Sequence, residues 1–550
     1  MLDERRAPQP NTEVAQRQAV GVLMSLGVTE APNVSMPPAA ANDIEIEADR
    51  PSRAARTDDD GPRRSWTLLS RHPWPLICVL LIQTALSARL AWSNTAFNDE
   101  ALYLWAGHWE ISHLLYGTKV PQFQTYFSGA PVLYPVVGAI ADSYGGLAAA
   151  RLLSLLFMLG TTTLLYLTGK RLYGNSAGVI GAGLFAVLGP VQFLGALATY
   201  DAMALFSLAL STWLVVMSRD RAIESMLLIP AALVLAIADA SKYATALWDP
   251  VVFAIAALTA SQPGWKHAAA RTGRMAGYTI AFLALFMRLA GKSYIQGILF
   301  TTLARHASTA PVMAVLRDSA LWIGILLLIA ARSIVIAPGT RARLFAITLT
   351  AAAILAPLEQ ARIHTATALQ KHVAFGAWFA AIAAGWVLAD AIKRSKYSKG
   401  RIFTATLSAM ALIGIVQATY LNEAWPNAKP VLAAIRRTMK TASGPILSEQ
   451  GVVVDYYLNL NPTRLTNTFG FTYYDEADKR TLSGLPAYVA AIKGHYFSVI
   501  EIDGMFTRYL PEDNAIVAAL DRDPHYQLVY TKAWEDHSSS GKYMVWEYRK

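Results

Sequence analysis

An adjacent acidic pair, Asp99 and Glu100, is the most chemically suggestive feature of the sequence. It lies in residues 93–135, SNTAFNDEALYLWAGHWEISHLLYGTKVPQFQTYFSGAPVLYP, between two apolar runs, and Tyr103 and His108 follow it. A connection that only reversed the chain would be short and polar. Carboxylates held next to apolar segments usually bind something or take part in chemistry. We therefore treat this segment as the centre of a predicted site.

A helix on a membrane surface is the predicted structure of the segment around this pair. Such a helix would place Tyr103 and the rings of residues 105–109, WAGHW, in the layer of lipid headgroups. Its carboxylates, among them Asp99, would then face a water-filled cleft.

A second acid, Asp201 in ATYDAMALF, begins a later apolar helix just after a short turn. One interpretation is a carboxylate favoured by the helix dipole, worth about 0.5–1 kcal/mol. The other is an acid that faces the same cleft as Asp99. Lys242 and Tyr243, in ADASKYATALW, end another apolar run. Lys242 could extend to the membrane surface, bind an anion, or pair with Asp239.

The densest group of cations is in residues 357–379, PLEQARIHTATALQKHVAFGAWF, with Arg362, His364, Lys371 and His372. Two cations and two imidazoles at one membrane edge suit a phosphate or pyrophosphate. A metal held by the two histidines and a solvated charged loop are the alternatives. Lys292 and Arg305, in the preceding loop, are weaker additions to the same site.

Composition limits the class of protein that can carry this site. The chain has 550 residues, 54% of them hydrophobic, and a mean hydropathy of +0.32, which predicts an integral membrane protein. The net charge of +10 lies in short loops between apolar runs, which disfavours nucleic-acid binding. The single cysteine, Cys78, excludes an intramolecular disulfide and a Cys-based metal site.

The apolar runs predict about eleven membrane helices, a number that depends on runs near the lower length limit for a span. They lie near residues 74–92, 147–168, 176–194, 199–217, 226–243, 247–261, 275–291, 318–337, 342–358, 372–392 and 402–420. Residues 1–65, rich in Ala, Pro, Arg and Asp, predict a disordered cytoplasmic tail. Arg63 and Arg64 could belong to an export signal, but a positive anchor at the first helix is the simpler interpretation.

The charges of the loops predict the orientation. The segments GKRLYGN, SRDRAIES, QPGWKHAAARTGR, APGTRAR and KRSKYSKGR are basic and poor in acid, as cytoplasmic loops are. The first outer loop, residues 93–146, has Lys119 as its only Lys or Arg and several acids. The predicted location is the cell (plasma) membrane. Since the N-terminal tail is predicted to be cytoplasmic, eleven helices, an odd number, would place the C-terminal region outside the cell.

Residues 421–550 have the composition of a soluble α/β domain of about 125 residues. The predicted helices are NEAWPNAKPVLAAIRRTMK, LPAYVAAIKG and NAIVAALDRDP. The predicted strands are GPILSEQGVVVDYYL, YFSVIEIDG and a closing hairpin of YQLVYTKAW and KYMVWEYRK. Tyr456, Tyr457, Tyr473 and Tyr474 could line an acceptor groove or pack in the core.

Four of these motifs together resemble a known superfamily. ARLAWSNTAFNDEALYLWAGHWE, ATYDAMALF, SKY and ARIHTATALQKHVAFG resemble the GT-C glycosyltransferases over about residues 74–420. The nearest likeness is the bacterial branch related to dolichyl-phosphate-mannose protein mannosyltransferases and to the aminoarabinose transferases of lipid A. The acidic pair followed by a tyrosine three residues later is the most specific part.

The resemblance implies a polytopic helical membrane enzyme that transfers a sugar from a polyprenyl phosphate to a hydroxyl acceptor on the extracytoplasmic face. It implies Asp99 as the acid that acts on the acceptor, Glu100 as its neighbour and Asp201 as the second acid. The donor phosphate would be held by a set of basic side chains: Lys242, Arg362, His364, Lys371 and His372, with Arg89, expected to be buried near the end of the first helix, as another candidate. Tyr103, His108 and Tyr243 are candidates for contact with the sugar or the acceptor.

The chemistry of a lipid-phosphate donor agrees with these roles. Its leaving group departs as a phosphate monoester, which nearby cations can stabilise. An opposed carboxylate, Asp99, can deprotonate the hydroxyl, and attack from the far face would invert the anomeric carbon. Asp99, Glu100 and Asp201 could also gather a divalent cation, or work without one. A transporter or flippase, or a noncatalytic binder of lipid-linked sugars, would use the same charges.

Overall fold

The computed structural model describes residues 74–550 with short gaps at 220–223, 261–263, 302–309, 395–398, 461–463, 468–470, 477, 505–509 and 538. The predicted tail of residues 1–65, with Arg63 and Arg64, lies outside the described residues, as does Arg305.

Helices occupy all eleven regions in which apolar runs predict them. They are α3 (Trp74–Ala91), α5 (Tyr134–Tyr173), α6 (Asn175–Ala186), α7 (Gly189–Leu194), α8 (Tyr200–Met217), α9 (Glu224–Ser241), η4 (Tyr243–Trp248), α10 (Asp249–Leu258), α11 (Trp265–Ala290), α13 (Val312–Ile336), α14 (Gly339–Ala351), α15 (Leu355–Arg362), α16 (Leu369–Arg394) and α17 (Lys399–Asn422). The region predicted as one helix at 176–194 is divided into α6 and α7. The run at 147–168 belongs to the longer α5, which has a kink at Gly145 and Gly146.

Fewer of these helices meet the length and apolarity of a membrane span than the sequence predicts. Within the described residues six qualify: α3, α5, α8, α13, α16 and residues 404–422 of α17. The number is seven if α14 and α15, which meet at 49°, form one bent span. The helices α6, α9 and α10 are apolar but shorter. The described residues thus contain six or seven candidate membrane spans, which indicates a multi-pass membrane protein.

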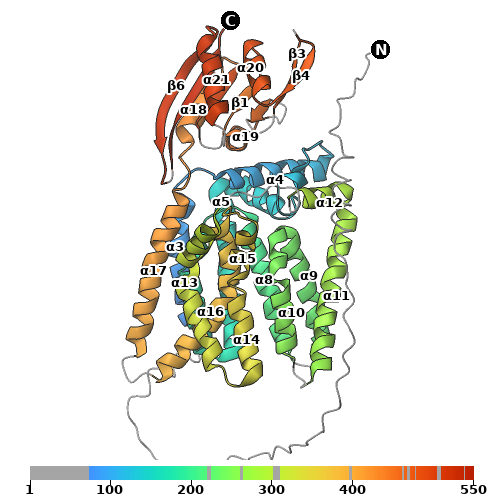
Figure 1. Ribbon diagram of the computed structural model, residues 1–550, viewed down its shortest axis with the longest axis vertical. Coiled ribbons are helices and arrows are strands. Elements are labelled where there is room, and N and C mark those ends of the chain that lie inside the picture. The colour runs from blue at the N-terminus through green and yellow to red at the C-terminus, as the bar shows by residue number, and fades with distance from the viewer. Residues whose placement is uncertain are drawn as a thin grey trace, which may run out of the picture. The chain divides into compact units, whose positions relative to one another are not determined.

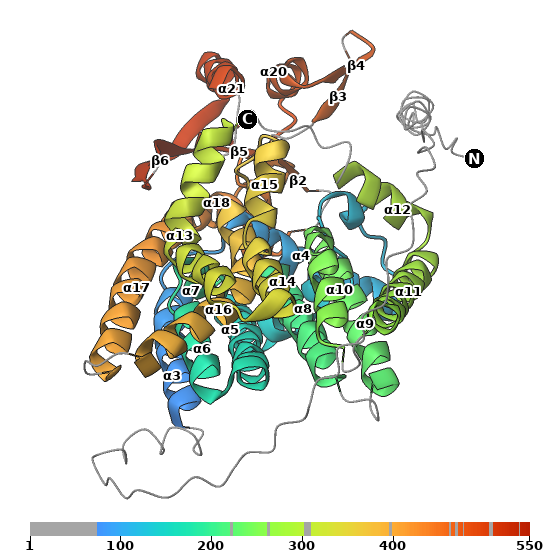
Figure 2. The ribbon, with the colours of Figure 1, turned by 60° about the horizontal axis from the view of Figure 1, so that its bottom comes forward.

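The bundle packs around α16, which is buried along most of its length. It contacts α5, α6, α13 and α14, and Figure 2 shows it among these helices. Small residues allow the close approach: a Cβ at Gly385 of α16 would lie 2.4 Å from the carbonyl oxygen of Ala177 in α6. The site described below lies at the first turn of this central helix.

Helix α4 (Asn98–Tyr116) carries the acidic pair and runs across the ends of the bundle helices rather than along them (Figure 1). This agrees with the helix predicted there, but its aromatic residues are placed differently. Tyr103 and Trp105 are buried against Phe123, Phe127 and other rings, because residues 117–133 fold back over α4. The prediction that these two rings face lipid headgroups is therefore wrong.

The C-terminal region, residues 423–550, contains a five-stranded sheet in the order β2-β1-β5-β7-β6. The strands are β1 (Ile446–Ser448), β2 (Leu465–Asn467), β5 (Val499–Ile502), β6 (Tyr526–Glu535) and β7 (Ser540–Tyr548). The first three named are parallel, and β7 pairs antiparallel with both β5 and β6. A separate hairpin joins β3 (Thr472–Asp475) and β4 (Arg480–Ser483).

Helices cover both faces of this sheet, because alternate residues of a strand point to opposite sides. Ile446 and Val499 pack on the side of α18 (Lys429–Thr438) and α19 (Gly451–Leu458). Leu447 and Ile500 pack on the side of α20 (Leu485–Lys493) and α21 (Leu510–Arg522). The strand predicted over residues 444–458 is mostly wrong, since only β1 is extended and α19 follows it. A short apolar run cannot distinguish a buried strand from a buried helix.

Helix α19 connects the C-terminal region to the elements that hold the acidic pair. The Tyr456 hydroxyl donates a hydrogen bond of 2.5 Å to Asp142 in α5, and the Ala96 N–H donates one of 2.8 Å to the Tyr457 hydroxyl. Tyr456 and Tyr457 therefore form hydrogen bonds between α19 and the elements around the acidic pair, whereas Tyr474 is exposed. Asp455, on the same helix, is buried, and its Oδ1 has no hydrogen-bond partner among the described residues.

Burial raises the pKa of Asp455 from its ordinary value near 3.8 to about 8. Between these two values the unfolded chain has released the proton while the folded chain keeps it, so stability falls as pH rises through this window. We expect Asp455→Asn, which is neutral at every pH, to be more stable than the wild type at pH 8, by about 1–3 kcal/mol. The gain should shrink toward pH 5 in thermal unfolding of the detergent-solubilised protein. A gain that is equal at both pH values would contradict a protonated Asp455.

Candidate active site

The start of α4 determines where Asp99 points. Phe97 is extended, with φ −66° and ψ 155°, and its N–H donates a 2.9 Å hydrogen bond to Oε2 of Glu100 in the first turn. Successive residues of a helix are about 100° apart around its axis. Asp99 and Glu100 therefore face different surroundings, although they are adjacent in the sequence.

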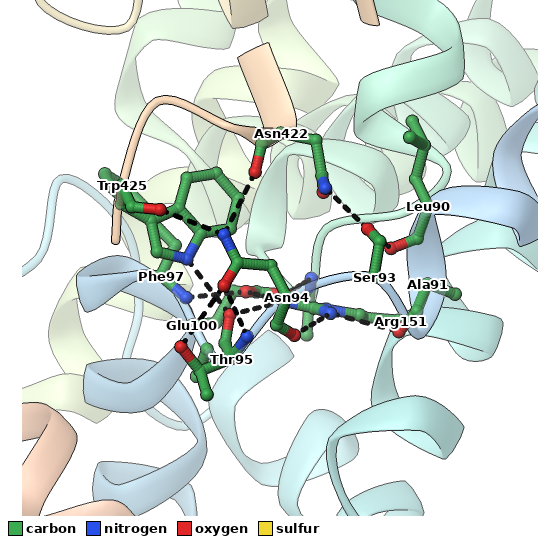
Figure 3. Close-up of polar contacts among 12 residues, drawn as sticks. Leu90, Ala91, Ser93, Asn94, Thr95, Phe97, Glu100, Arg151, Asn422 and Trp425 are labelled. Carbon is green, nitrogen blue, oxygen red and sulfur yellow. Dashed lines mark hydrogen bonds and ion pairs between the residues drawn. The ribbon is translucent and has the colours of Figure 1, made fainter. Parts of the chain in front are cut away.

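Glu100 forms a fully buried ion pair with Arg151 of α5. Arg151 Nε and Nη2 donate to the two carboxylate oxygens at 2.8 and 2.7 Å, and the Ala198 N–H donates to Oε1 at 2.7 Å. The remaining guanidinium hydrogens go to the main-chain carbonyls of Ala91, Asn94 and Thr95. Figure 3 shows Arg151 and Glu100 inside this ring of main-chain groups.

The same network reaches the chain beyond α17. The Asn94 amide donates to the carbonyls of Asn422 and Trp425 at 3.2 and 3.0 Å, and the Trp425 indole donates to Thr95 O at 3.0 Å (Figure 3). The loop before α4 is thus joined to α5, to the turn before α8 and to the end of α17. Residues far apart in the sequence fix the position of Asp99.

Asp99 is paired with Lys371 of α16. Lys371 Nζ lies 2.6 Å from Asp99 Oδ2, and Lys371 is buried while the Asp99 side chain is 34% exposed. Lys371 is the third residue of α16, where the helix dipole disfavours a cation. The carboxylate of Asp99 offsets this cost. A helix N-terminus is also a natural place for an anion to bind.

Asp201 and Lys242 form a second buried ion pair nearby. Lys242 Nζ contacts Asp201 Oδ1, and the Thr199 hydroxyl donates to Asp201 Oδ2 at 2.9 Å. Asp201 is in the first turn of α8, so the helix dipole also favours its charge. The Asp201 side chain is only 1% exposed. The helix-dipole interpretation agrees with this position, while an acid that faces a cleft shared with Asp99 stays a prediction.

Lys242 is held by its main chain as well as by its charge. It lies in extended conformation between α9 and η4, where the Ala130 N–H donates to Ala240 O at 2.8 Å and the Tyr243 N–H to Ser128 O at 2.9 Å. A Cβ at Gly129 would lie 2.0 Å from Ser241 O, so only glycine allows this crossing. The loop after α4 therefore fixes the main chain at Lys242, whose charge interacts with that of Asp99.

Aromatic rings join the two ion pairs into one cluster of charges. Lys371 interacts electrostatically with Asp201 as well as with Asp99. The ring of Tyr200 lies 4.6 Å from that of Tyr103 and 5.3 Å from Lys242 Nζ. Lys242 and Lys371 also lie over the rings of Phe375 and Phe97 at 5.7 Å each. We call Asp99, Lys371, Asp201 and Lys242 the charge cluster.

Tyr103 is a protonated donor at the edge of the charge cluster. Burial raises its pKa well above the ordinary range, and Tyr200, Asp99 and Asp201 raise it further. Its phenol can therefore donate a hydrogen bond but not act as a base. His372, next to Lys371, contacts the side-chain oxygen of Gln360 through Nδ1 at 3.2 Å.

Four of the six predicted phosphate ligands lie outside the charge cluster, although one of them, His372, interacts electrostatically with Lys242, Asp201 and Lys371. Arg89 is exposed rather than buried and contacts Thr419 and the Ile415 carbonyl of α17 and Gln192 of α7. Arg362 is exposed and pairs with Glu359 at 2.6 Å, and His364 is exposed in the turn after α15. Arg362 and His364 are thus exposed while Lys371 is buried, although these residues lie close together in the sequence.

Two predicted sugar or acceptor contacts also have other partners. His108 Nε2 lies 2.7 Å from Oδ2 of Asp142, and the Oδ1 of the same carboxylate accepts from the Tyr456 hydroxyl, so this histidine belongs to the contact with α19. Tyr243 is half-buried and interacts with Tyr294 of α12 (Lys292–Leu299). Lys292, at the start of α12, is exposed. Tyr103, by contrast, interacts electrostatically with Asp99 and Asp201 of the charge cluster.

A divalent cation does not fit the three predicted acids as they are arranged. Asp99, Asp201 and Glu100 are each paired with a different cation, Lys371, Lys242 and Arg151. Their oxygens do not converge on one point, and the only group of metal-ligating atoms within the described residues lies in the C-terminal region. We therefore derive no step through a metal at this site.

Several residues that complete the site are not among those predicted from the sequence. Arg151 stands alone in the apolar run GGLAAARLLSLL, and a single charge in such a run is itself a signal for a buried partner. Tyr200 and Phe375 gave no signal, because aromatic residues are common in membrane helices. Their importance follows only from the tertiary contact with Lys242.

Comparison with known proteins identifies the fold. No protein-family model matches the sequence, and no curated protein sequence matches it. Among solved structures, ArnT from Cupriavidus metallidurans bound to undecaprenyl phosphate matches with a TM-score of 0.57 and 12% identity, covering 88% of this chain and 98% of that chain. The archaeal oligosaccharyltransferase AglB from Archaeoglobus fulgidus, in complex with an inhibitory peptide and a dolichol-phosphate, matches with a TM-score of 0.53 and 12% identity, covering 87% and 74%.

The arabinofuranosyltransferase AftD from Mycobacteria matches with a TM-score of 0.52 and 14% identity over 86% of this chain and 40% of that chain. At these identities the likeness concerns the fold. The resemblance to GT-C proteins that the sequence indicates is thus confirmed at the level of structure.

We expect Glu100→Gln to destabilise the protein strongly, because it leaves the charge of Arg151 buried without a partner. Loss of one member of a buried ion pair costs about 3–5 kcal/mol. Thermal unfolding in detergent measures the effect. Asp390→Asn is the matched control, since it removes the acid of an exposed pair with Arg394 and should change stability by less than about 1 kcal/mol. Equal melting temperatures for the two variants would contradict a structural role of Glu100.

Proposed function

We propose that this protein is a membrane glycosyltransferase that moves a sugar from a polyprenyl phosphate to a hydroxyl acceptor on the extracytoplasmic face. The observation that carries the proposal is the charge cluster at the end of the bundle, with two lysines and one partly exposed carboxylate, in a GT-C fold. The relatives of this fold add support, because ArnT and AglB are each solved with a polyprenyl or dolichol phosphate.

Lys371 and Lys242 are the proposed ligands of the donor phosphate. Both are buried, and Lys371 is in the first turn of α16, so the helix dipole and two cations would act on one anion. Asp201 keeps Lys242 in place through its ion pair. Buried lysines stabilise developing negative charge more than exposed ones, because water does not screen them.

Asp99 is the proposed general base. Its side chain is 34% exposed and that of Asp201 only 1%, so of these two acids Asp99 is the one an acceptor can reach. When the donor phosphate takes hydrogen bonds from Lys371, Asp99 Oδ2 becomes open to a hydroxyl hydrogen. Glu100 then has no part in the proton transfer, because Arg151, Phe97 and Ala198 occupy its oxygens.

The proposed reaction is a single displacement at the anomeric carbon. The acceptor oxygen forms a bond to C1 while its proton passes to Asp99. The bond from C1 to the phosphate oxygen breaks, and its electron pair leaves with the polyprenyl phosphate, next to the two lysines. Attack opposite the leaving group inverts the anomeric configuration. The acceptor is a hydroxyl of a protein, a glycan or a lipid.

A transfer assay tests this proposal. The purified protein in nanodiscs receives radiolabelled polyprenyl-phosphate sugars of several kinds and a crude envelope acceptor fraction. We expect transfer together with release of polyprenyl phosphate. Asp99→Asn should reduce the rate by about 10²–10⁴-fold, as loss of a general base does.

Lys371→Met should also weaken binding of the donor, whereas Arg394→Gln at the far end of α16 should change neither quantity. Near-normal transfer by a folded Asp99→Asn protein would overturn the assignment of the base. The contrasting outcome is label that is bound or moved across the bilayer without transfer, equally by the wild type and the variant. That result would show that the protein is a transporter or a noncatalytic binder and not an enzyme.

A further inference from the structure

Two histidines and an aspartate converge in the C-terminal region, in a place that the proposed transfer reaction does not use. His495 follows α20, and Asp523 and His525 lie between α21 and β6. His495 Nε2 is 2.9 Å from Asp523 Oδ2, and His525 Nδ1 is 3.1 Å from Asp523 Oδ1. One potential ligand atom from each residue lies within 4.8 Å of the other two.

The main chain holds all three residues in this arrangement. His495 has a φ of +54°, a left-handed conformation that costs energy for a residue other than glycine. Hydrogen bonds from His495 N–H to Ile492 O and from Tyr496 N–H to Ala491 O keep it there. On the other side, the His525 N–H donates to Asp523 Oδ1 at 3.0 Å. Hydrogen-bonded turns thus fix the main-chain positions of the residues that carry the three side chains.

The distances suit a small divalent cation. Zn²⁺ binds imidazole nitrogen and carboxylate oxygen at about 2.0–2.2 Å, so neighbouring ligand atoms in a tetrahedral site are about 3.4 Å apart. The observed 2.9 and 3.1 Å are slightly shorter. A small outward movement of the two rings would admit the ion. Two imidazoles and a carboxylate are ligands that zinc and similar transition metals accept.

An aromatic ring packs beside the two imidazoles. The ring of Tyr548 lies 4.8 Å from that of His495 and 6.1 Å from that of His525. This ring limits the orientations that the two imidazoles can adopt.

An ion can reach the group from a neighbouring pocket. His495 and Tyr548 line a pocket of about 790 Å³ between α18 and the ends of β6 and β7. The Asp523 side chain is 15% exposed and that of His525 47%, so the group is open enough for exchange with solvent. The route, the ligands and the geometry that a metal site needs are therefore present together.

We propose that His495, Asp523 and His525 bind one divalent transition-metal ion, with Zn²⁺ as the representative. The ion would tie the end of α20 to the turn between α21 and β6. Three protein ligands leave a fourth position for water or a small anion. The site is separate from the charge cluster, so the proposal holds whether or not the protein transfers sugars.

The test is zinc binding by the full-length protein in detergent after treatment with EDTA. Titration against a competing coloured chelator should show one tightly bound equivalent, and zinc should raise the melting temperature. His495→Gln and His525→Gln should each weaken binding by more than about 100-fold, since even an outer partner of a ligand is worth 10–100-fold. Substitution by Co²⁺ should give the visible absorption of a low-coordinate site in the wild type alone.

His537→Gln is the matched control. His537 lies in the same region but pairs with Glu423 and stacks on Tyr420, so its loss should not change zinc binding. Asp99→Asn should also bind zinc normally, which separates this site from the charge cluster. If a histidine variant does not fold, Asp523→Asn gives the same comparison with a side chain of equal size. Wild-type protein without a tight equivalent, or equal binding by all variants, would overturn the proposal.

Discussion

The buried ion pair between Glu100 and Arg151 is the interaction on which the rest of the site depends. Removing two charges from water is costly, and the pair is stable only because hydrogen bonds satisfy both partners. Arg151 binds the carbonyls of Ala91, Asn94 and Thr95, and Glu100 accepts from the N–H groups of Phe97 and Ala198. One salt bridge thus organises the end of α3, the first turn of α4 and the chain before α8.

This arrangement explains how two neighbouring acids serve different purposes. Glu100 points into the protein and sets the position of α4, which leaves Asp99 at the exposed side with Lys371. Ala198, bound to Glu100, precedes Asp201 by three residues, so the second acid is placed from the same point. Asp99 and Asp201 are therefore positioned relative to each other through Glu100, which is fully buried.

Much of the fold and all four residues of the charge cluster can be predicted from the sequence. Apolar runs indicate the positions of the helices, because about 20 consecutive apolar residues are typical of a helix that spans a membrane. Asp99, Asp201, Lys242 and Lys371 stand out because charge beside apolar runs is rare, and the structure brings all four together. The GT-C resemblance rests on the same residues and agrees with the fold.

The rest depends on tertiary contacts that spacing does not encode. Arg362 and His364 lie near Lys371 in the chain, but both are exposed at the end of α15 and in the turn after it, and Arg362 pairs with Glu359. Arg89 lies at the end of an apolar helix and was predicted to be buried, yet it is exposed beside α17. The segment that forms α19 was predicted as a strand, because its Val-rich run satisfies either structure and only contact with α4 decides.

The most direct measurement is an experimental structure of the full-length protein in nanodiscs with a polyprenyl phosphate bound. The proposed function predicts density for the phosphate within hydrogen-bonding distance of Lys371 or Lys242, at the first turn of α16, with Asp99 released from Lys371. A phosphate held instead by Arg89, or by Arg362 and His364, with the pair of Asp99 and Lys371 still intact, would contradict it.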